Sequence, residues 1–182
     1  MNYATIKNWD IANGPGVRVS LFVSGCTHRC KGCFNQEAWD FQYGDPFTQE
    51  TIDQILDMLA PSYVSGLTVL GGEPLEQDNQ IAVLDLLRQV KNKYPDKSIW
   101  FFSGYVFDKH IMPCKFVCSE ITKELLSYID VIVDGPFIEE KKNLMLRFRG
   151  SSNQRIIDVK KSLGSNMVVL WEDWQGNRGG TV

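Results

Sequence analysis

Residues 24–35 read SGCTHRCKGCFN and contain three closely spaced cysteines, Cys26, Cys30 and Cys33. The preceding residues 17–23, VRVSLFV, are mostly apolar or β-branched, so we expect them to form a buried strand. Cysteines on a loop at the end of a strand can converge on one metal centre. Three thiolates are one ligand fewer than a closed zinc site or an ordinary four-iron cluster requires. The interpretation therefore depends on whether another residue supplies the fourth ligand or the fourth position is open.

Closed sites have several candidates for the missing ligand. A structural zinc ion would take it from His28, His110, Cys114 or Cys118, and a cluster that only transfers electrons would take it from Cys114 or Cys118. Zinc ribbons usually pair two Cys-x-x-Cys knuckles, whereas this chain has one. A non-catalytic metal-binding module is therefore a weaker interpretation of the loop. Three unrelated buried cysteines, each packing as a small apolar residue, are weaker still.

Composition excludes several classes of protein. The chain has 182 residues, 43% of them apolar, which is enough for one domain with a proper core. Its net charge of −3 argues against a nucleic-acid partner, and no apolar run approaches the length of a membrane span. The N-terminus has no signal-peptide pattern, and five cysteines are an odd number for a disulfide framework. We therefore expect a reduced, cytoplasmic α/β protein.

Apolar residues at strand and helix spacings alternate along the chain. Thr48 and Ser119 are placed to cap helices, and Pro61 and Pro95 to end them. The first twelve residues give no pattern, 37–43 allow a helical turn or two, and 104–118 read as irregular. The predicted strands are 17–23, 66–70, 98–102, 130–134, 154–159 and 167–171, and the predicted helices are 52–59, 81–90 and 121–129.

This alternation indicates an α/β fold with a mostly parallel sheet and crossover helices. A complete eight-fold barrel usually needs about 250 residues, so we predict a partial, open (βα) barrel of about five βα units. Such folds place their chemistry at the carboxyl ends of the strands. Two motifs fall there: the cysteine loop and the turn Gly71-Gly72-Glu73-Pro74.

The Gly-Gly-Glu-Pro turn has features of a ligand site. Gly71 and Gly72 let the backbone approach a ligand closely, and Glu73 offers an acceptor for an ammonium group. Pro74 fixes the exit of the turn and can open the next helix. Because glycine turns after strands are common, this turn is informative only in combination with the cysteine loop.

The combination resembles the radical S-adenosylmethionine superfamily, which carries Cys-x3-Cys-x2-Cys after its first strand. The resemblance implies that Cys26, Cys30 and Cys33 hold a [4Fe-4S] cluster whose open iron binds S-adenosylmethionine (SAM). It also implies that the cofactor is cleaved to a 5′-deoxyadenosyl radical. The residues that the resemblance places around SAM are Gly32, Cys33, Phe34, Gly71, Gly72, Glu73 and Pro74.

Further motifs narrow the resemblance to the glycyl-radical activating enzymes, most closely those of anaerobic ribonucleotide reductase. Gly32 precedes the last cysteine of the loop, and Phe34 and Asn35 follow it. The other matching stretches are NGPGVR at 13–18, SGY at 103–105, DGP at 134–136 and RGSSNQR at 149–155. The resemblance spans about 2–156, which is nearly all of the predicted activase domain, 1–156. It leaves 157–182, with Trp171 and Trp174, as an extension of unknown role.

This branch implies a task and partners. The task is removal of a Cα hydrogen from a glycine near the C-terminus of a large reductase subunit, which leaves a glycyl radical. A small flavodoxin-like donor would supply the electron, and a homodimer is an open alternative to a monomer. Cys114 and Cys118 lie outside the family pattern. A radical SAM enzyme acting on a small molecule, such as a deazaguanine synthase, is the alternative, and Asn35 with 149–155 favours the activase.

Overall fold

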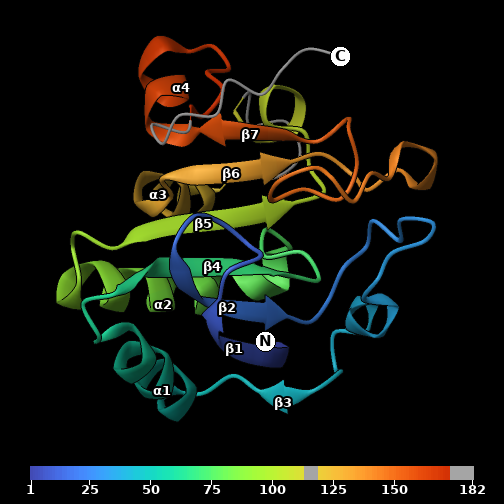
Figure 1. The fold of residues 1–182 in the computed structure, drawn as a ribbon. Helices are drawn as coiled ribbons and strands as arrows, with labels where there is room; N and C mark the ends of the chain where they lie inside the picture. The colour runs from blue at the N-terminus through green and yellow to red at the C-terminus, as the bar shows by residue number, and fades with distance from the viewer. Residues whose placement is uncertain (113–118, 173–182) are drawn as a thin grey trace.

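The computed structural model of the chain describes residues 1–112 and 119–172. Its strands are β1 (Asn2–Asp10), β2 (Val17–Val23), β3 (Asp45–Pro46), β4 (Val64–Gly71), β5 (Ser98–Ser103), β6 (Val131–Asp134) and β7 (Arg155–Asp158). They form one open sheet in the order β3-β1-β2-β4-β5-β6-β7 (Figure 1). The four central strands, β2, β4, β5 and β6, run parallel, whereas β1, β3 and β7 pair antiparallel with their neighbours.

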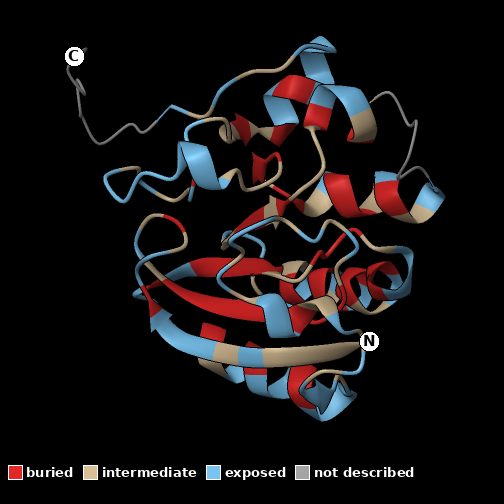
Figure 2. Ribbon diagram, turned by 90° about the vertical axis from the view of Figure 1, so that its right-hand side faces the viewer, coloured by how far each residue is buried: buried red, intermediate tan, exposed pale blue. Residues whose placement is uncertain are grey.

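Three helices connect the central strands: α1 (Gln49–Leu59), α2 (Gln77–Lys93) and α3 (Glu120–Tyr128). In Figure 1, α2 and α3 lie behind the sheet. Alternate strand residues, including Leu21, Val69 and Phe101, are fully buried in one apolar cluster with these helices. Figure 2 shows the same division, with buried residues on the central strands and on the sheet-facing sides of the helices. The central strands are buried on both faces, as expected of parallel strands.

The opposite face of the sheet holds a buried cation. Arg18 of β2 is fully buried, and its Nε donates a hydrogen bond to the Thr68 hydroxyl at 2.7 Å. Its Nη2 donates to the carbonyls of Leu67 at 2.7 Å and Ser98 at 2.9 Å. Burial lowers the pKa of Arg18 to about 10. One side chain thus ties β2, β4 and β5 together on the face away from the helices.

Of the residues after 156, Trp171 packs onto that face, whereas Ile157 and Val159 join the apolar cluster on the helix side. Trp100 of β5 makes edge-to-face contacts with Trp171, at 5.0 Å between ring centroids, and with Phe148, at 5.6 Å. The short helix α4 (Val159–Ser165) begins at Asp158, whose side chain accepts a hydrogen bond from the Lys161 amide. Trp171, which had no role in the sequence interpretation, therefore covers the core.

The local predictions for the central strands and helices are confirmed. Residues 17–23 form a strand with the predicted bounds, and Thr48 and Ser119 cap α1 and α3. In both capping boxes the hydroxyl of the third helical residue, Thr51 or Thr122, accepts a hydrogen bond from the backbone amide of the capping residue. The helical turn expected in 37–43 is a 3₁₀ turn at Gln36–Trp39.

Four local predictions need correction. Most of the first twelve residues, Asn2–Asp10, form β1. Its mixed, partly exposed residues give no apolar pattern, because backbone pairing to β2 holds the strand. The 104–118 stretch contains a π-helical turn, Phe107–Ile111, while Cys114 and Cys118 lie outside the described residues. Val159 begins α4 rather than ending a strand. Residues 167–171 form only an isolated bridge, Ile157 to Leu170, at the edge of the sheet.

The global prediction is confirmed in its coarser form. The fold is α/β with an open, mostly parallel sheet, but five βα units are not confirmed, because three helices cross between four parallel strands in the described residues. The outer strands β1, β3 and β7 pair antiparallel and do not extend the series of parallel βα units. Within 1–112 and 119–172, no helix combines the length and apolar character that crossing a membrane demands.

Candidate functional site

The carboxyl ends of the central strands surround a pocket of about 500 Å³. The cysteine loop after β2 and the glycine turn after β4 form its inner wall, to which Ser103 and Gly104 at the end of β5 also contribute. The loop between β6 and β7 forms its outer wall. Since the carboxyl ends of parallel strands meet at one edge of a sheet, motifs that are far apart in sequence converge here.

All three predicted cluster ligands line this pocket. Cys26, Cys30 and Cys33 are free thiols and half-buried. Burial raises the pKa of Cys26 to about 12 and also raises that of Cys30. The backbone amide of Asn35 donates to the Cys33 sulfur at 3.4 Å. Desolvated thiols of this kind become thiolates only beside a cation, so the donor set fits a cationic iron–sulfur centre.

The same residues fit a single metal ion less well. In the described part of the chain, no three His, Cys, Asp or Glu side chains are grouped closely enough to hold one ion. His28, one of the four candidates for a fourth ligand, is bound to a carboxylate instead. His110 accepts a hydrogen bond from the Val106 amide through Nδ1, at 2.9 Å. The pocket thus offers three thiols spread along one loop.

Backbone hydrogen bonds join the cysteine loop to the glycine turn. The Gly72 amide donates to the Val23 carbonyl at 2.7 Å, and the Glu73 amide donates to the Gly25 carbonyl at 2.8 Å. The buried side chain of Asn79 on α2 adds to these bonds, because its Nδ2 donates to the carbonyls of Ser24 at 2.9 Å and Glu73 at 3.0 Å. A Cβ at Gly72 would lie 2.6 Å from the Gly25 carbonyl oxygen, so this close approach requires glycine.

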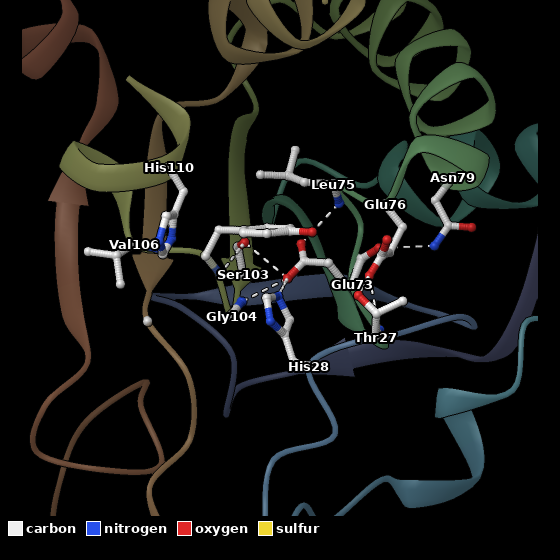
Figure 3. A network of polar contacts seen from close by, with 12 residues as sticks. Thr27, His28, Glu73, Leu75, Glu76, Asn79, Ser103, Gly104, Val106 and His110 are labelled. Carbon is white, nitrogen blue, oxygen red and sulfur yellow. Dashed lines mark hydrogen bonds and ion pairs between the residues drawn. The ribbon is translucent and has the colours of Figure 1, made fainter. Parts of the chain in front are cut away.

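Glu73 is the centre of a buried polar network (Figure 3). Its carboxylate is fully buried, and Oε2 accepts from the Ser103 hydroxyl at 3.0 Å and the Gly104 amide at 2.8 Å. His28 Nε2 lies 2.9 Å from the same oxygen, and the Leu75 amide donates to Oε1 at 3.0 Å. The side chain therefore joins the ends of β4 and β5 to the cysteine loop.

The predicted SAM residues divide into two groups in this geometry. Gly32, Cys33, Phe34, Gly71 and Gly72 line the pocket. Glu73 and Pro74, the second half of the turn, are buried and do not line the pocket. Protein donors occupy both oxygens of the Glu73 carboxylate, so the turn presents its glycine backbone to a ligand. A direct contact between Glu73 and an ammonium group stays a prediction.

His28 has a fixed place in the site that its position in the sequence did not reveal. Burial alone would lower its pKa, but the hydrogen bond and charge of Glu73 raise the pKa above its ordinary value. Its ring lies 4.4 Å from the Tyr105 ring in an edge-to-face contact. A Cβ at Gly104 would lie 2.4 Å from His28 Cδ2. The Ser-Gly-Tyr motif at 103–105 therefore forms the binding site of the His28 imidazole. The position of this motif at the carboxyl end of β5, the strand next to β4, was the sequence signal that it belongs to the site.

A second contact ties the same loop to the same turn. Glu76, three residues after Glu73, accepts hydrogen bonds from the Thr27 amide at 2.9 Å and the Thr27 hydroxyl at 2.5 Å. Figure 3 shows Thr27 and His28 reaching two carboxylates on one turn. Thr27 and His28 therefore fix the first half of the cysteine loop to the turn after β4.

The RGSSNQR motif at 149–155 borders the pocket on the outer wall. Arg149, Gly150 and Gln154 line it. Gln154 accepts from the amides of Gly150 at 2.9 Å and Ser151 at 3.1 Å, and Arg149 Nη1 donates to the Gln154 carbonyl at 2.8 Å. The motif is therefore a self-bonded turn that also faces the site.

Arg155 fastens that turn to the sheet. Its Nη2 donates to Asp134 at 2.5 Å and to Asp108 at 2.6 Å. The two carboxylates raise the pKa of Arg155, and the hydrogen bond from Arg155 lowers the pKa of Asp108. The DGP motif at 134–136 thus holds the base of the outer wall.

Comparisons with known proteins agree with this geometry. Residues 12–157 match the family model of a 4Fe-4S single cluster domain. A Vibrio cholerae protein is 43% identical over 158 residues, covering 86% of this chain and 97% of the relative. A relative from Enterobacteria phage T4 is 41% identical, covering 94% and 99%, and one from Escherichia coli K12 is 38% identical, covering 85% and 96%. All three relatives are named anaerobic ribonucleoside-triphosphate reductase-activating protein. The chain belongs to this family of reductase-activating proteins.

Proposed function

We propose that the chain activates an anaerobic ribonucleotide reductase by generating a glycyl radical on its large subunit. The observation that carries the proposal is the pocket in which three free thiols face a glycine turn, in a chain of the activating-protein family. The enzyme is an oxidoreductase, and its substrate is a segment of another protein. The named relatives favour this over the small-molecule alternative.

Cys26, Cys30 and Cys33 would hold the [4Fe-4S] cluster in this proposal. The chemistry that the cluster would supply, once reduced by an external electron donor, is the one-electron cleavage of bound SAM to methionine and the radical that takes the glycine hydrogen. The glycine backbone of the turn and the residues Gly32 and Phe34 border SAM. Glu73 and His28 keep the glycine turn and the cysteine loop in register from the protein side.

The open sheet suits a protein substrate. We interpret it as a partial barrel of the radical SAM type, with helices on one face and an unclosed edge. A polypeptide can reach the pocket through that edge, and glycine suits as the target because it has no Cβ to block approach. We further propose a flavodoxin-like electron donor and a cytoplasmic setting, and the family leaves a homodimer open.

Electron paramagnetic resonance tests the proposal. The anaerobically reconstituted protein, supplied with dithionite, SAM and the reductase, should give the doublet of a glycyl radical and equimolar 5′-deoxyadenosine. Failure to form 5′-deoxyadenosine under these conditions would refute it.

Ligand variants test the cluster assignment. Cys30→Ser should abolish both the brown colour and SAM cleavage, because a cluster held by two thiolates is lost. Cys114→Ser/Cys118→Ser is the matched control, and both properties should survive in it. Iron analysis and 5′-deoxyadenosine chromatography measure the two properties, and loss of iron in the control would mean that a fourth protein ligand exists.

A further inference from the structure

The most exposed large apolar side chains of the described residues gather at the mouth of the pocket. Met145 is 88% exposed, Leu144 87% and Phe34 83%, whereas the next, Ile11, is 73% exposed. Phe34 and Leu144 line the pocket, and Met145 follows Leu144 on the outer wall. They come from two segments more than a hundred residues apart in sequence. Exposed apolar groups concentrated at one site indicate an interaction surface rather than a random surface pattern.

The partner at this surface is larger than the cofactor. A small molecule enclosed in the pocket would leave side chains that are 87% and 88% exposed largely in water. A polypeptide that passes over the mouth would cover them, and buried apolar anchors of this kind contribute most of the affinity at protein interfaces.

The loop that carries Leu144 and Met145 is pre-formed. The Asn143 amide donates to the Gly150 carbonyl at 3.3 Å, and the Met145 amide donates to the Asn143 side chain at 2.9 Å. At its base, Lys142 and Ser151 form an antiparallel bridge. A pre-formed loop loses less conformational entropy when a partner binds.

Charge narrows the kind of partner. Residues 141–149, KKNLMLRFR, contain four basic and no acidic residues, in a chain whose net charge is −3. This strip favours a segment with neutral or acidic side chains beside its apolar ones and disfavours a second copy of the same strip.

We propose that Phe34, Leu144 and Met145 form an apolar clamp that binds an extended segment of the reductase on either side of its target glycine. The proposal rests on the proposed function and assigns the substrate-docking surface of that same site. Phe34 contributes from the cysteine loop and Leu144 from the outer wall, and both line the pocket, while Met145 extends the apolar surface next to Leu144. The target glycine is thereby held over the inner wall, where the thiols lie.

The test is the double variant Leu144→Ser/Met145→Ser, assayed as the reconstituted holoenzyme. The glycyl doublet is measured against the concentration of the reductase large subunit, and 5′-deoxyadenosine formation is measured separately without reductase. The half-saturating reductase concentration should rise about tenfold or more. Met145→Ser alone alters no pocket-lining residue, so it should give a smaller rise in the same direction while cleavage of SAM without reductase stays at the wild-type rate.

The matched control is Ile81→Ser/Met167→Ser. These side chains are 69% and 67% exposed and do not line the pocket. The control should behave as wild type in both assays. Wild-type activation by the clamp variant, an equal defect in the control, or loss of cleavage without reductase in Met145→Ser would overturn the docking proposal. A variant that activates normally but loses self-association would assign the surface to a second copy instead. Absence of the doublet with the wild-type protein would refute the proposed function itself.

Discussion

The two walls of the pocket are built differently. On the inner wall, the carboxylate of Glu73 has protein donors on both oxygens, and Gly72 and Gly104 pack so tightly that neither has room for a Cβ. On the outer wall, Leu144 and Met145 are almost fully exposed. The Glu73 network of the inner wall is thus fixed in advance, whereas the apolar side chains at the pocket that are exposed, Leu144 and Met145 on the outer wall and Phe34 on the cysteine loop, leave their contacts unmade.

Removing the centre of the inner wall should have the largest effect on folding. Glu73→Ala would leave the Ser103 hydroxyl, the Gly104 amide and His28 without their acceptor in a buried site. We expect it to lower the free energy of unfolding by about 3–5 kcal/mol and to abolish SAM cleavage. Urea unfolding of the reduced, metal-free protein measures the first effect.

Glu76→Ala is the control on the same turn. Glu76 is only half-buried and its contacts go to one residue, Thr27, so its loss should cost about 1 kcal/mol. Equal costs for the two variants would show that the inner wall is not centred on Glu73.

A smaller loss of stability is expected from a substitution that crowds the inner wall without removing a hydrogen-bond acceptor. Gly104→Ala places a methyl group 2.4 Å from His28 Cδ2, and the imidazole is held between Glu73 and Tyr105. The shift that this forces should cost about 1–3 kcal/mol and raise the SAM concentration needed for half-maximal cleavage.

Gly164→Ala supplies the comparison, because nothing lies within 4 Å of its added Cβ. In α4 this change should be neutral or stabilise the protein by about 0.5–1 kcal/mol. If Gly104→Ala had the same free energy of unfolding and the same half-saturating SAM concentration as Gly164→Ala, the close packing of Gly104 against His28 would be contradicted.

The sequence was sufficient to predict which motifs form the inner wall, but not the hydrogen bonds that join them. The strand at 17–23 is mostly apolar or β-branched, and in a parallel sheet the cysteine loop and the glycine turn had to meet at one edge. Two of the partners of Glu73, Ser103 and His28, lie 30 and 45 residues away, so the pattern of residues around Glu73 does not identify them. The loop at 142–150 has neither strand nor helix periodicity, so its place at the pocket depends on tertiary contacts alone. β1 was missed for a similar reason, because almost all of its residues are half-buried or exposed and give no apolar pattern.

The ion pairs of Arg155 at the base of the outer wall include one buried and one exposed carboxylate. Removing the exposed carboxylate should change the free energy of unfolding least. Arg155 binds buried Asp134 on one side and Asp108, whose side chain is 37% exposed, on the other. Because the hydrogen bond from Arg155 lowers the folded-state pKa of Asp108, its stabilisation is present above the unfolded pKa of about 3.9 and is lost as the pH falls through the lower folded value. Solvent screening limits that stabilisation to about 0.5 kcal/mol. Wild type should therefore unfold at slightly higher urea than Asp108→Asn at pH 7, and the gap should close toward pH 3. Asp57→Asn, which removes a carboxylate that is 84% exposed, should show no gap at either pH. A gap for Asp108→Asn that persists at pH 3 would mean that Asp108 stabilises the outer wall by packing rather than by charge.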